Sequence, residues 1–99
     1  MALHRETIYQ NKLVKKLQDI LPGCFILQND PEEYQGIPDL LLLFGNRWAA
    51  LEVKMSPTSR IQPNQQYYVN LFDEMAFASF ICPETEEQVI KELVGSFGC

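Results

Sequence analysis

The sequence has 99 residues, of which 46% are hydrophobic and 21% are charged. This length and composition predict one globular domain over residues 1–99 and exclude a two-domain chain. The formal net charge of −5 comes entirely from residues 61–99, because residues 1–60 hold equal numbers of acidic and basic side chains. Any surface that faces nucleic acid is therefore expected in the first 60 residues.

The sequence carries no recognisable targeting segment or zinc-binding motif. The first ten residues lack the apolar core of a signal peptide, and no apolar run is long enough to span a membrane, so no membrane partner is expected. Cys24, Cys82 and Cys99 are scattered and His4 is the sole histidine, which argues against structural zinc. Reduced thiols and a cytoplasmic location are the expectation.

The first elements are predicted from apolar spacing. Residues 5–20 carry leucines at helical spacing, and a Pro-Gly pair at 22–23 ends that pattern, which predicts an amphipathic helix. A short strand over residues 24–27 and a polar loop over residues 28–36 follow. The chain therefore starts with a helix, a strand and a loop.

Two apolar runs, residues 40–44 and 47–53, flank the pair Gly45-Asn46 and predict a β-hairpin with a two-residue turn. Residues 40–43 are apolar at every position, so the hairpin is expected to be covered on both faces.

Two helices and a strand complete the predicted order. Pro63 suits the first turn of a helix that runs to about residue 75, and a strand over residues 78–82 follows. Thr85 and Gln88 fit a capping box that opens a last helix. The order α-β-β-β-α-β-α predicts a mixed α/β sandwich.

The turn also predicts which acids meet. If position 44 pairs with position 47, Asp39 falls opposite Glu52, and Lys54 shares that side because side chains alternate along a strand. Two carboxylates that face each other repel, so a cation is expected between them, and oxygen ligands suit Mg²⁺ or Mn²⁺ better than zinc. The alternative is a partly exposed salt-bridge cluster of Lys54 with either acid.

Two polar residues lie on predicted apolar helix faces. Glu6 shares the core-facing side of the first helix, and it either belongs to the site or interacts with the helix dipole. Gln65 heads the apolar side of the second helix, and it either belongs to the site or bonds the helix end.

The strings GIPD at residues 36–39 and LEVK at residues 51–54 resemble the PD-(D/E)xK nuclease signature. With Glu6, Gln10 and Gln65 in this order, the chain resembles more narrowly the VRR-NUC-like branch over roughly residues 5–82. That branch includes small stand-alone phage proteins and domains of larger repair nucleases, and it is related to archaeal-type Holliday junction resolvases. Gln35 departs from the pattern, because many relatives carry a basic residue there, which puts a phosphate contact at this position in doubt.

The resemblance implies a restriction-endonuclease-like mixed sheet and a metal site for hydrolysis of DNA phosphodiesters. Asp39, Glu52 and the backbone carbonyl of Val53 would hold Mg²⁺, for which Mn²⁺ substitutes. Glu6 would act through water or bind a second metal ion.

Lys54 and Gln65 have implied roles as well. Lys54 would orient the attacking water or stabilise charge on the phosphate, and Gln65 would position Lys54 or the water. Phosphate contacts are expected from six basic residues, which are Arg5, Lys12, Lys15, Lys16, Arg47 and Arg60.

The implied function is a metal-dependent DNA endonuclease that selects branched or flapped DNA. A Holliday junction resolvase acting as a symmetric homodimer and a generic nicking enzyme are the enzymatic alternatives. A dimer interface would draw on the aromatic cluster of Tyr67, Tyr68 and Phe72. The non-enzymatic alternatives are a catalytically idle nuclease-like module for binding DNA or protein and an unrelated α/β interaction module. A phage origin, by analogy with the family, would place the protein in the host cytoplasm.

Overall fold

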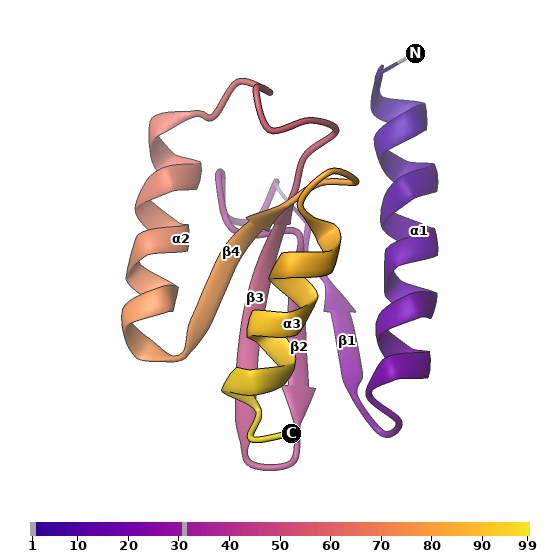
Figure 1. Cartoon of the computed structure of the whole chain (residues 1–99). Coiled ribbons are helices and arrows are strands. Elements are labelled where there is room, and N and C mark those ends of the chain that lie inside the picture. The colour runs from indigo at the N-terminus through magenta and orange to yellow at the C-terminus, as the bar shows by residue number, and fades with distance from the viewer. Residues whose placement is uncertain (1, 31) are drawn as a thin grey trace.

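The computed structural model describes residues 2–30 and 32–99 of the chain (Figure 1). The elements are α1 (Ala2–Ile20), β1 (Phe25–Gln28), β2 (Leu40–Phe44), β3 (Arg47–Val53), α2 (Pro63–Met75), β4 (Phe77–Ile81) and α3 (Glu86–Ser96). The predicted order of helices and strands is confirmed, and α1 begins three residues earlier than expected. The fold is a mixed α/β fold. No helix in the described ranges is long and apolar enough to cross a membrane.

Within residues 2–30 and 32–99 the strands form one mixed sheet of four strands in the order β1-β2-β3-β4. β1, β2 and β3 pair antiparallel, whereas β4 runs parallel to β3 after the crossover through α2. Gly45 has φ of 63° in the turn, a conformation that glycine adopts without strain. Phe44 consequently pairs with Arg47, and Leu40 pairs with Leu51. The predicted hairpin register is confirmed over the paired residues.

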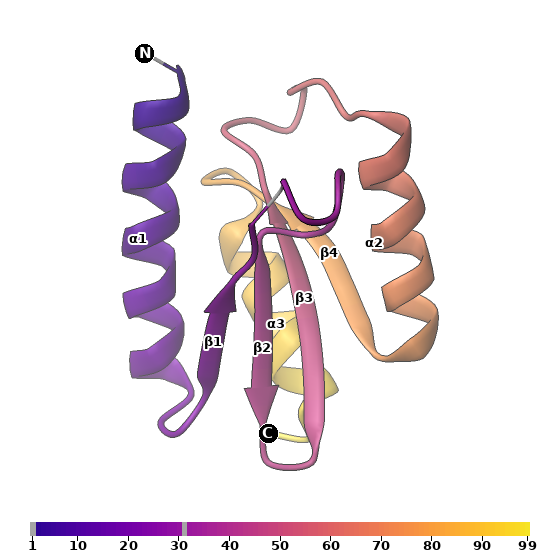
Figure 2. The same cartoon turned by 180° about the vertical axis from the view of Figure 1, so that it is seen from behind.

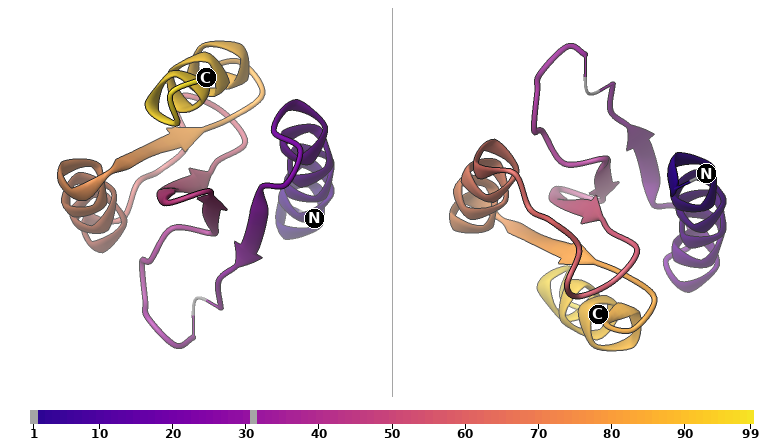
Figure 3. Two further views of the ribbon diagram at one scale, coloured as in Figure 1. Left: turned by 90° about the horizontal axis from the view of Figure 1, so that it is seen from below. Right: turned by 90° about the horizontal axis from the view of Figure 1, so that it is seen from above.

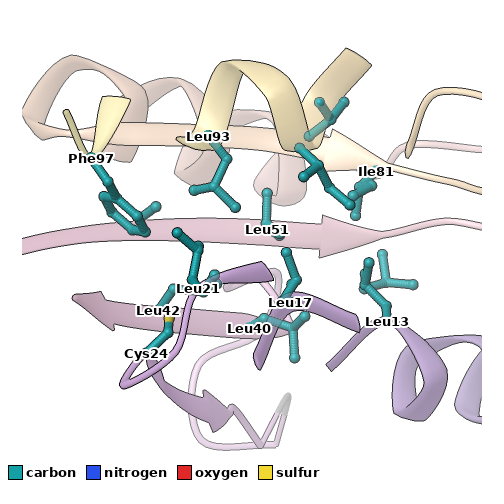
Figure 4. Packing of buried hydrophobic residues seen from close by; sticks show 14 residues of the cluster. Leu13, Leu17, Leu21, Cys24, Leu40, Leu42, Leu51, Ile81, Leu93 and Phe97 are labelled. Carbon is teal, nitrogen blue, oxygen red and sulfur yellow. The ribbon is translucent and has the colours of Figure 1, made fainter. Parts of the chain in front are cut away.

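Helices α1 and α3 pack on one face of the sheet and enclose the main core (Figure 4). Figure 3 looks along the strands and shows α1 and α2 at opposite edges of the sheet. A buried leucine contributes roughly 1.5–3 kcal/mol to stability, so Leu13 and Leu17 do much to fix α1, the helix that carries Glu6. The largest fully buried apolar side chains of this core are Leu13, Leu17, Leu21, Leu40, Leu42, Leu51, Val53, Ile81 and Leu93.

Helix α2 covers the other face of β3 and β4. Ala50, Val69 and Ala78 are buried there, and the rings of Trp48 and Phe72 pack edge to face with their centroids 5.8 Å apart. Because side chains alternate along a strand, residues 48, 50 and 52 of β3 project to this side. Glu52 therefore faces α2 rather than the main core.

The prediction that the hairpin is covered on both faces is wrong for β2. Leu43 keeps 40% of its surface exposed, and its cross-strand partner Phe25 keeps 62%. Helix α2 lies beside β4 and leaves this side of β1 and β2 uncovered (Figure 2). β2 therefore has one buried side and one partly exposed side, although all its residues are apolar. The exposure of that side depends on where the distant helix α2 packs.

The predicted capping box at the start of α3 is also wrong. Thr85 is the N-cap residue, but its side chain makes no cap hydrogen bond to the helix. Its Oγ1 instead accepts a 3.2 Å hydrogen bond from the backbone N–H of Cys82, while the Gln88 side chain donates to Glu92. Thr85 thus stabilises the turn between β4 and α3 rather than the first turn of the helix.

Candidate active site

Asp39 lies one residue before β2, and main-chain groups fix its position. The backbone N–H of Val53 donates a 2.8 Å hydrogen bond to Asp39 Oδ2. The carbonyl of Asp39 accepts a 2.8 Å hydrogen bond from the N–H of Asn29, whose side chain also donates to the carbonyl of Pro38. The Asp39 carboxylate is therefore held against the end of β3, where the hairpin register predicts it.

Glu52 is a buried acid on β3, with 4% of its surface exposed. Its Oε2 accepts a 3.0 Å hydrogen bond from Gln65 Nε2 and lies 3.9 Å from Lys54 Nζ. Burial raises the pKa of Glu52 to about 8, and the negative charge of Asp39 adds to the rise. Near neutral pH, Glu52 therefore either holds a proton or needs a nearby cation to stay charged.

The two carboxyl groups titrate together. Burial raises the pKa of Asp39 as well, against the hydrogen bond from Val53 and the positive charge of Lys54. Two desolvated carboxylates at close range cannot both stay charged without a compensating positive charge. This pair is therefore the part of the site that a divalent cation would stabilise.

Lys54 and Gln65 are held together beside this pair. Lys54 Nζ donates hydrogen bonds to Gln65 Oε1 at 2.8 Å and to the carbonyl of Arg60 at 3.0 Å. Gln65 Oε1 also accepts a 2.9 Å hydrogen bond from the N–H of Gln62, at the start of α2. Gln65 uses its amide oxygen for Lys54 and its amide nitrogen for Glu52, so it bridges a cation and an acid.

The first turn of α2 also holds the loop that leads to Asp39. Asn64 Nδ2 donates a 3.0 Å hydrogen bond to the carbonyl of Gln35. Gly36 has φ of 90°, and a Cβ at this position would lie 2.5 Å from Asn64 Cγ. The role of Asn64 is absent from the sequence prediction, although the glycine three residues before Asp39 is the signal of a close backbone approach.

Glu6 approaches the site from α1. Burial raises its pKa, the charge of Asp39 raises it further, and Lys54 lowers it. Glu6 also raises the pKa of Glu52, so it lies within electrostatic range of both acids. Gln10, one turn later, donates a 3.0 Å hydrogen bond to the Gln28 side chain rather than to a carboxylate of the site.

The donor set fits a hard divalent cation bound by two protein carboxylates. In the ranges that the structure describes, no group of three or more His, Cys, Asp or Glu side chains is arranged as a metal cluster. Further ligands to such an ion would be a backbone carbonyl, such as that of Val53, and water. This set suits Mg²⁺, which usually keeps several waters in proteins.

A hollow of about 570 Å³ lies beside Lys54, and we call it the basic hollow. Of the six candidate phosphate-binding residues, Arg5 and Arg60 line it together with Lys54 and Glu6. A second, neutral hollow of about 490 Å³ is lined by Gln65 and other residues with uncharged side chains. Lys54 lines the basic hollow and Gln65 lines the neutral hollow, and these two side chains are hydrogen-bonded to each other.

The structure does not bring the other candidate basic residues to this site. Arg47 lies at the turn end of the hairpin, where it donates a 3.1 Å hydrogen bond to the Ser96 carbonyl. Lys16 forms an ion pair with Glu86 of α3. Lys12 and Lys15, the remaining two, are exposed on α1.

The predicted dimer cluster lies on α2. Tyr67 is 60% exposed, whereas Tyr68 and Phe72 are half-buried. Phe72 packs on Trp48 of the sheet, so it serves the fold of the single chain. Tyr67 is therefore the member of the cluster that lies on the surface.

Comparison with known proteins identifies no relative, because no family model, no curated protein and no solved structure matches the chain.

Proposed function

We propose that the protein is a metal-dependent endonuclease that hydrolyses DNA phosphodiester bonds at Asp39, Glu52 and Lys54. The observation that carries the proposal is the burial of Glu52 beside a second carboxylate, with 4% of its surface exposed. Burying two acids together destabilises a fold, so an electrostatic cluster of this kind is a candidate functional site. Lys54 supplies the positive charge that such a site needs next to a phosphate.

The substrate class rests on the resemblance to the PD-(D/E)xK nucleases. The strings at residues 36–39 and 51–54 supply the two acids and the lysine, and Gln65 follows them in the order of the VRR-NUC-like branch. This resemblance favours branched, flapped or four-way DNA as the substrate and a restriction-endonuclease-like sheet as the fold. A second copy of the chain would be required for paired cuts at a junction.

Asp39 and Glu52, with the carbonyl of Val53, would bind the metal ion. When bound, Mg²⁺ or Mn²⁺ supplies Lewis-acid activation of the phosphate and a lower pKa for the attacking water. The hydrogen bond from the Val53 N–H orients the Asp39 carboxylate for this role. The hydrogen bond from Gln65 does the same for Glu52.

Lys54 stabilises the negative charge that develops on the phosphate as the bond to the leaving oxygen breaks. Its ammonium is kept in place by Gln65 and by the carbonyl of Arg60, so little reorganisation is needed during the reaction. The side chain of Lys54 is 15% exposed, which shields its charge from water and strengthens its effect on a bound phosphate.

A cleavage assay on duplex, flapped and four-way DNA with Mg²⁺ or Mn²⁺ tests the proposal. Asp39→Asn and Lys54→Met should each lower the rate by a hundredfold or more, about the loss expected for a group that stabilises the transition state. Asp30→Asn and Lys91→Met are matched controls, because they remove the same charges from exposed positions. Both controls should cleave at the wild-type rate.

Three outcomes contradict the proposal. Cleavage that survives Asp39→Asn and Lys54→Met would place the chemistry elsewhere. DNA binding without cleavage under any divalent cation would favour the catalytically idle module. A chain that neither binds DNA nor responds to divalent cations in thermal unfolding would be an unrelated interaction module.

A further inference from the structure

The basic hollow differs in charge from the protein around it. The chain carries a net charge of −5, yet Arg5, Lys54 and Arg60 line the hollow against one acid, Glu6. Such a local excess of positive charge in an acidic protein attracts anions to one place. The neutral hollow, which Gln65 lines, has no charged side chain in its lining.

The two arginines are available to a ligand. Lys54 is occupied by Gln65, the Arg60 carbonyl and Glu52. In the described part of the chain, by contrast, neither guanidinium group of Arg5 and Arg60 forms a hydrogen bond or an ion pair. A guanidinium offers a fork of N–H donors that matches two oxygens of a phosphate.

The rest of the lining offers further donors of the right kind. Ser56 and Ser59 line the hollow, and their hydroxyl oxygens lie 3.2 Å apart. The backbone N–H of Ser56 donates to Ser59 Oγ at 3.1 Å, which fixes that hydroxyl in the loop. Serine hydroxyls rotate to donate to an acceptor, so they complement the two arginines around a phosphate.

We propose that the basic hollow binds one phosphate group of the DNA strand next to the phosphate that is cleaved at Asp39 and Glu52. This inference rests on the proposed nuclease function. Lys54 belongs both to the carboxylate cluster and to the lining of the hollow, so a phosphate bound there adjoins the reacting one. The bound group is either an internal phosphodiester or the terminal phosphate of a strand, which share the same oxygen acceptors.

The test measures binding of a short single-stranded oligonucleotide to the whole chain by fluorescence anisotropy. Ca²⁺ replaces Mg²⁺, because both bind oxygen ligands. Each internal phosphate is replaced in turn by an uncharged methylphosphonate, and in a second arm the terminal phosphate is replaced by a hydroxyl. The variants are Arg5→Gln and Arg60→Gln, with Lys91→Gln as a control that removes one charge from α3.

The wild-type protein should lose about tenfold in affinity when the phosphate that fits the hollow is neutralised, as expected for a charge-assisted contact. Arg5→Gln and Arg60→Gln should bind intact DNA more weakly and no longer respond to that one replacement. Lys91→Gln should keep the wild-type profile. The arm in which the loss occurs identifies the bound group as internal or terminal.

The proposal is overturned if the profiles of Arg5→Gln and Arg60→Gln both match that of Lys91→Gln. A second outcome is a wild-type protein that cleaves DNA but whose affinity falls on no replacement other than that of the cleaved phosphate. The hollow would then not be a phosphate site, and the nuclease function would stand. A wild-type protein that neither binds nor cleaves DNA would overturn both. Both arginines are exposed, so these variants are expected to fold as the wild type does.

Discussion

The side chain of Gln65 donates a 3.0 Å hydrogen bond to Glu52 and thereby links α2 to the buried acid of β3. The buried carboxylate of Glu52 thus receives one hydrogen bond from another side chain of the protein. The same amide holds Lys54 through its oxygen, at 2.8 Å. Gln65 is therefore a positioning residue, which acts through the two groups that it touches.

Gln65→Ala should lower the cleavage rate about tenfold to a hundredfold, because Lys54 and Glu52 both lose a partner. The Mg²⁺ concentration at half-maximal rate should also rise, since one hydrogen bond that favours the charged form of Glu52 is gone. Gln66→Ala is the matched control, because Gln66 is exposed and bonds to Asn70. Equal rates and equal Mg²⁺ dependence in the two variants would contradict the positioning role.

Glu52→Gln should abolish cleavage and, in the absence of divalent cations, stabilise the fold. The substitution removes a buried charge next to Asp39, and a buried charge beside a charge of the same sign destabilises a fold. Urea unfolding in EDTA at mildly alkaline pH measures the effect. Glu92→Gln, on the exposed side of α3, should change the free energy of unfolding by less than about 0.5 kcal/mol. A destabilised Glu52→Gln protein would show that the charge of Glu52 supports the fold.

Without divalent cations, the stability of the wild-type protein should fall as the pH rises from about 4.5 to about 8. The reference pKa of a glutamate is 4.5, and the folded protein raises the pKa of Glu52 to about 8. The folded state therefore binds more protons than the unfolded state over this interval, so stability is full below it and is lost through it. Saturating Mg²⁺ should reduce the loss, because the cation replaces the proton.

Thermal unfolding in EDTA and in Mg²⁺ across this range gives the measurement. Glu52→Gln is the control, because its profile should be flatter than that of the wild type in EDTA. A wild-type profile as flat as that of Glu52→Gln would mean that Glu52 titrates normally in the folded chain.

Gly36→Ala should destabilise the protein more than Gly23→Ala. Both glycines have φ near 90°, which costs a residue with a side chain about 1–2 kcal/mol. A Cβ at Gly23 meets nothing within 4 Å, whereas one at Gly36 lies 2.5 Å from Asn64. The difference between the two variants isolates the contact between the loop and α2.

Asn64→Ala in the Gly36→Ala background should recover part of the additional loss, because two clashing atoms, Asn64 Cγ and Nδ2, are removed while Asn64 Cβ stays 2.8 Å from the added methyl group. Urea unfolding of the single and double variants makes the comparison. Equal losses for Gly23→Ala and Gly36→Ala would show that the loop moves away from α2 at little cost.

The order of the elements and the hairpin register are predictable from the sequence because their signals are local. Apolar spacing marks the helices, and Gly45-Asn46 fixes the turn and with it the pairing of β2 and β3. This register alone predicts that Asp39 lies against the end of β3. Lys54 then lies on the same side by the alternation of side chains.

Contacts between distant segments are not predictable in this way. The uncovered side of Leu43 depends on where α2 packs, and the apolar pattern of β2 contains no information on that helix. The capping role expected of Thr85 fails because the turn at Cys82 competes for the same hydroxyl. The bond from Asn64 to Gln35 joins residues 29 positions apart, and no local spacing indicates it.

The two-residue turn makes the candidate site sensitive to the length of the strands. Five residues of β2 separate the turn from Asp39, and the same number of residues in β3 separates it from Glu52. Apolar substitutions within these stretches leave the two acids facing each other. Deletion of one residue from either stretch would turn one acid to the opposite side of the sheet, since side chains alternate with a period of two. A one-codon deletion could therefore eliminate the site while every residue that composes it stays in the protein.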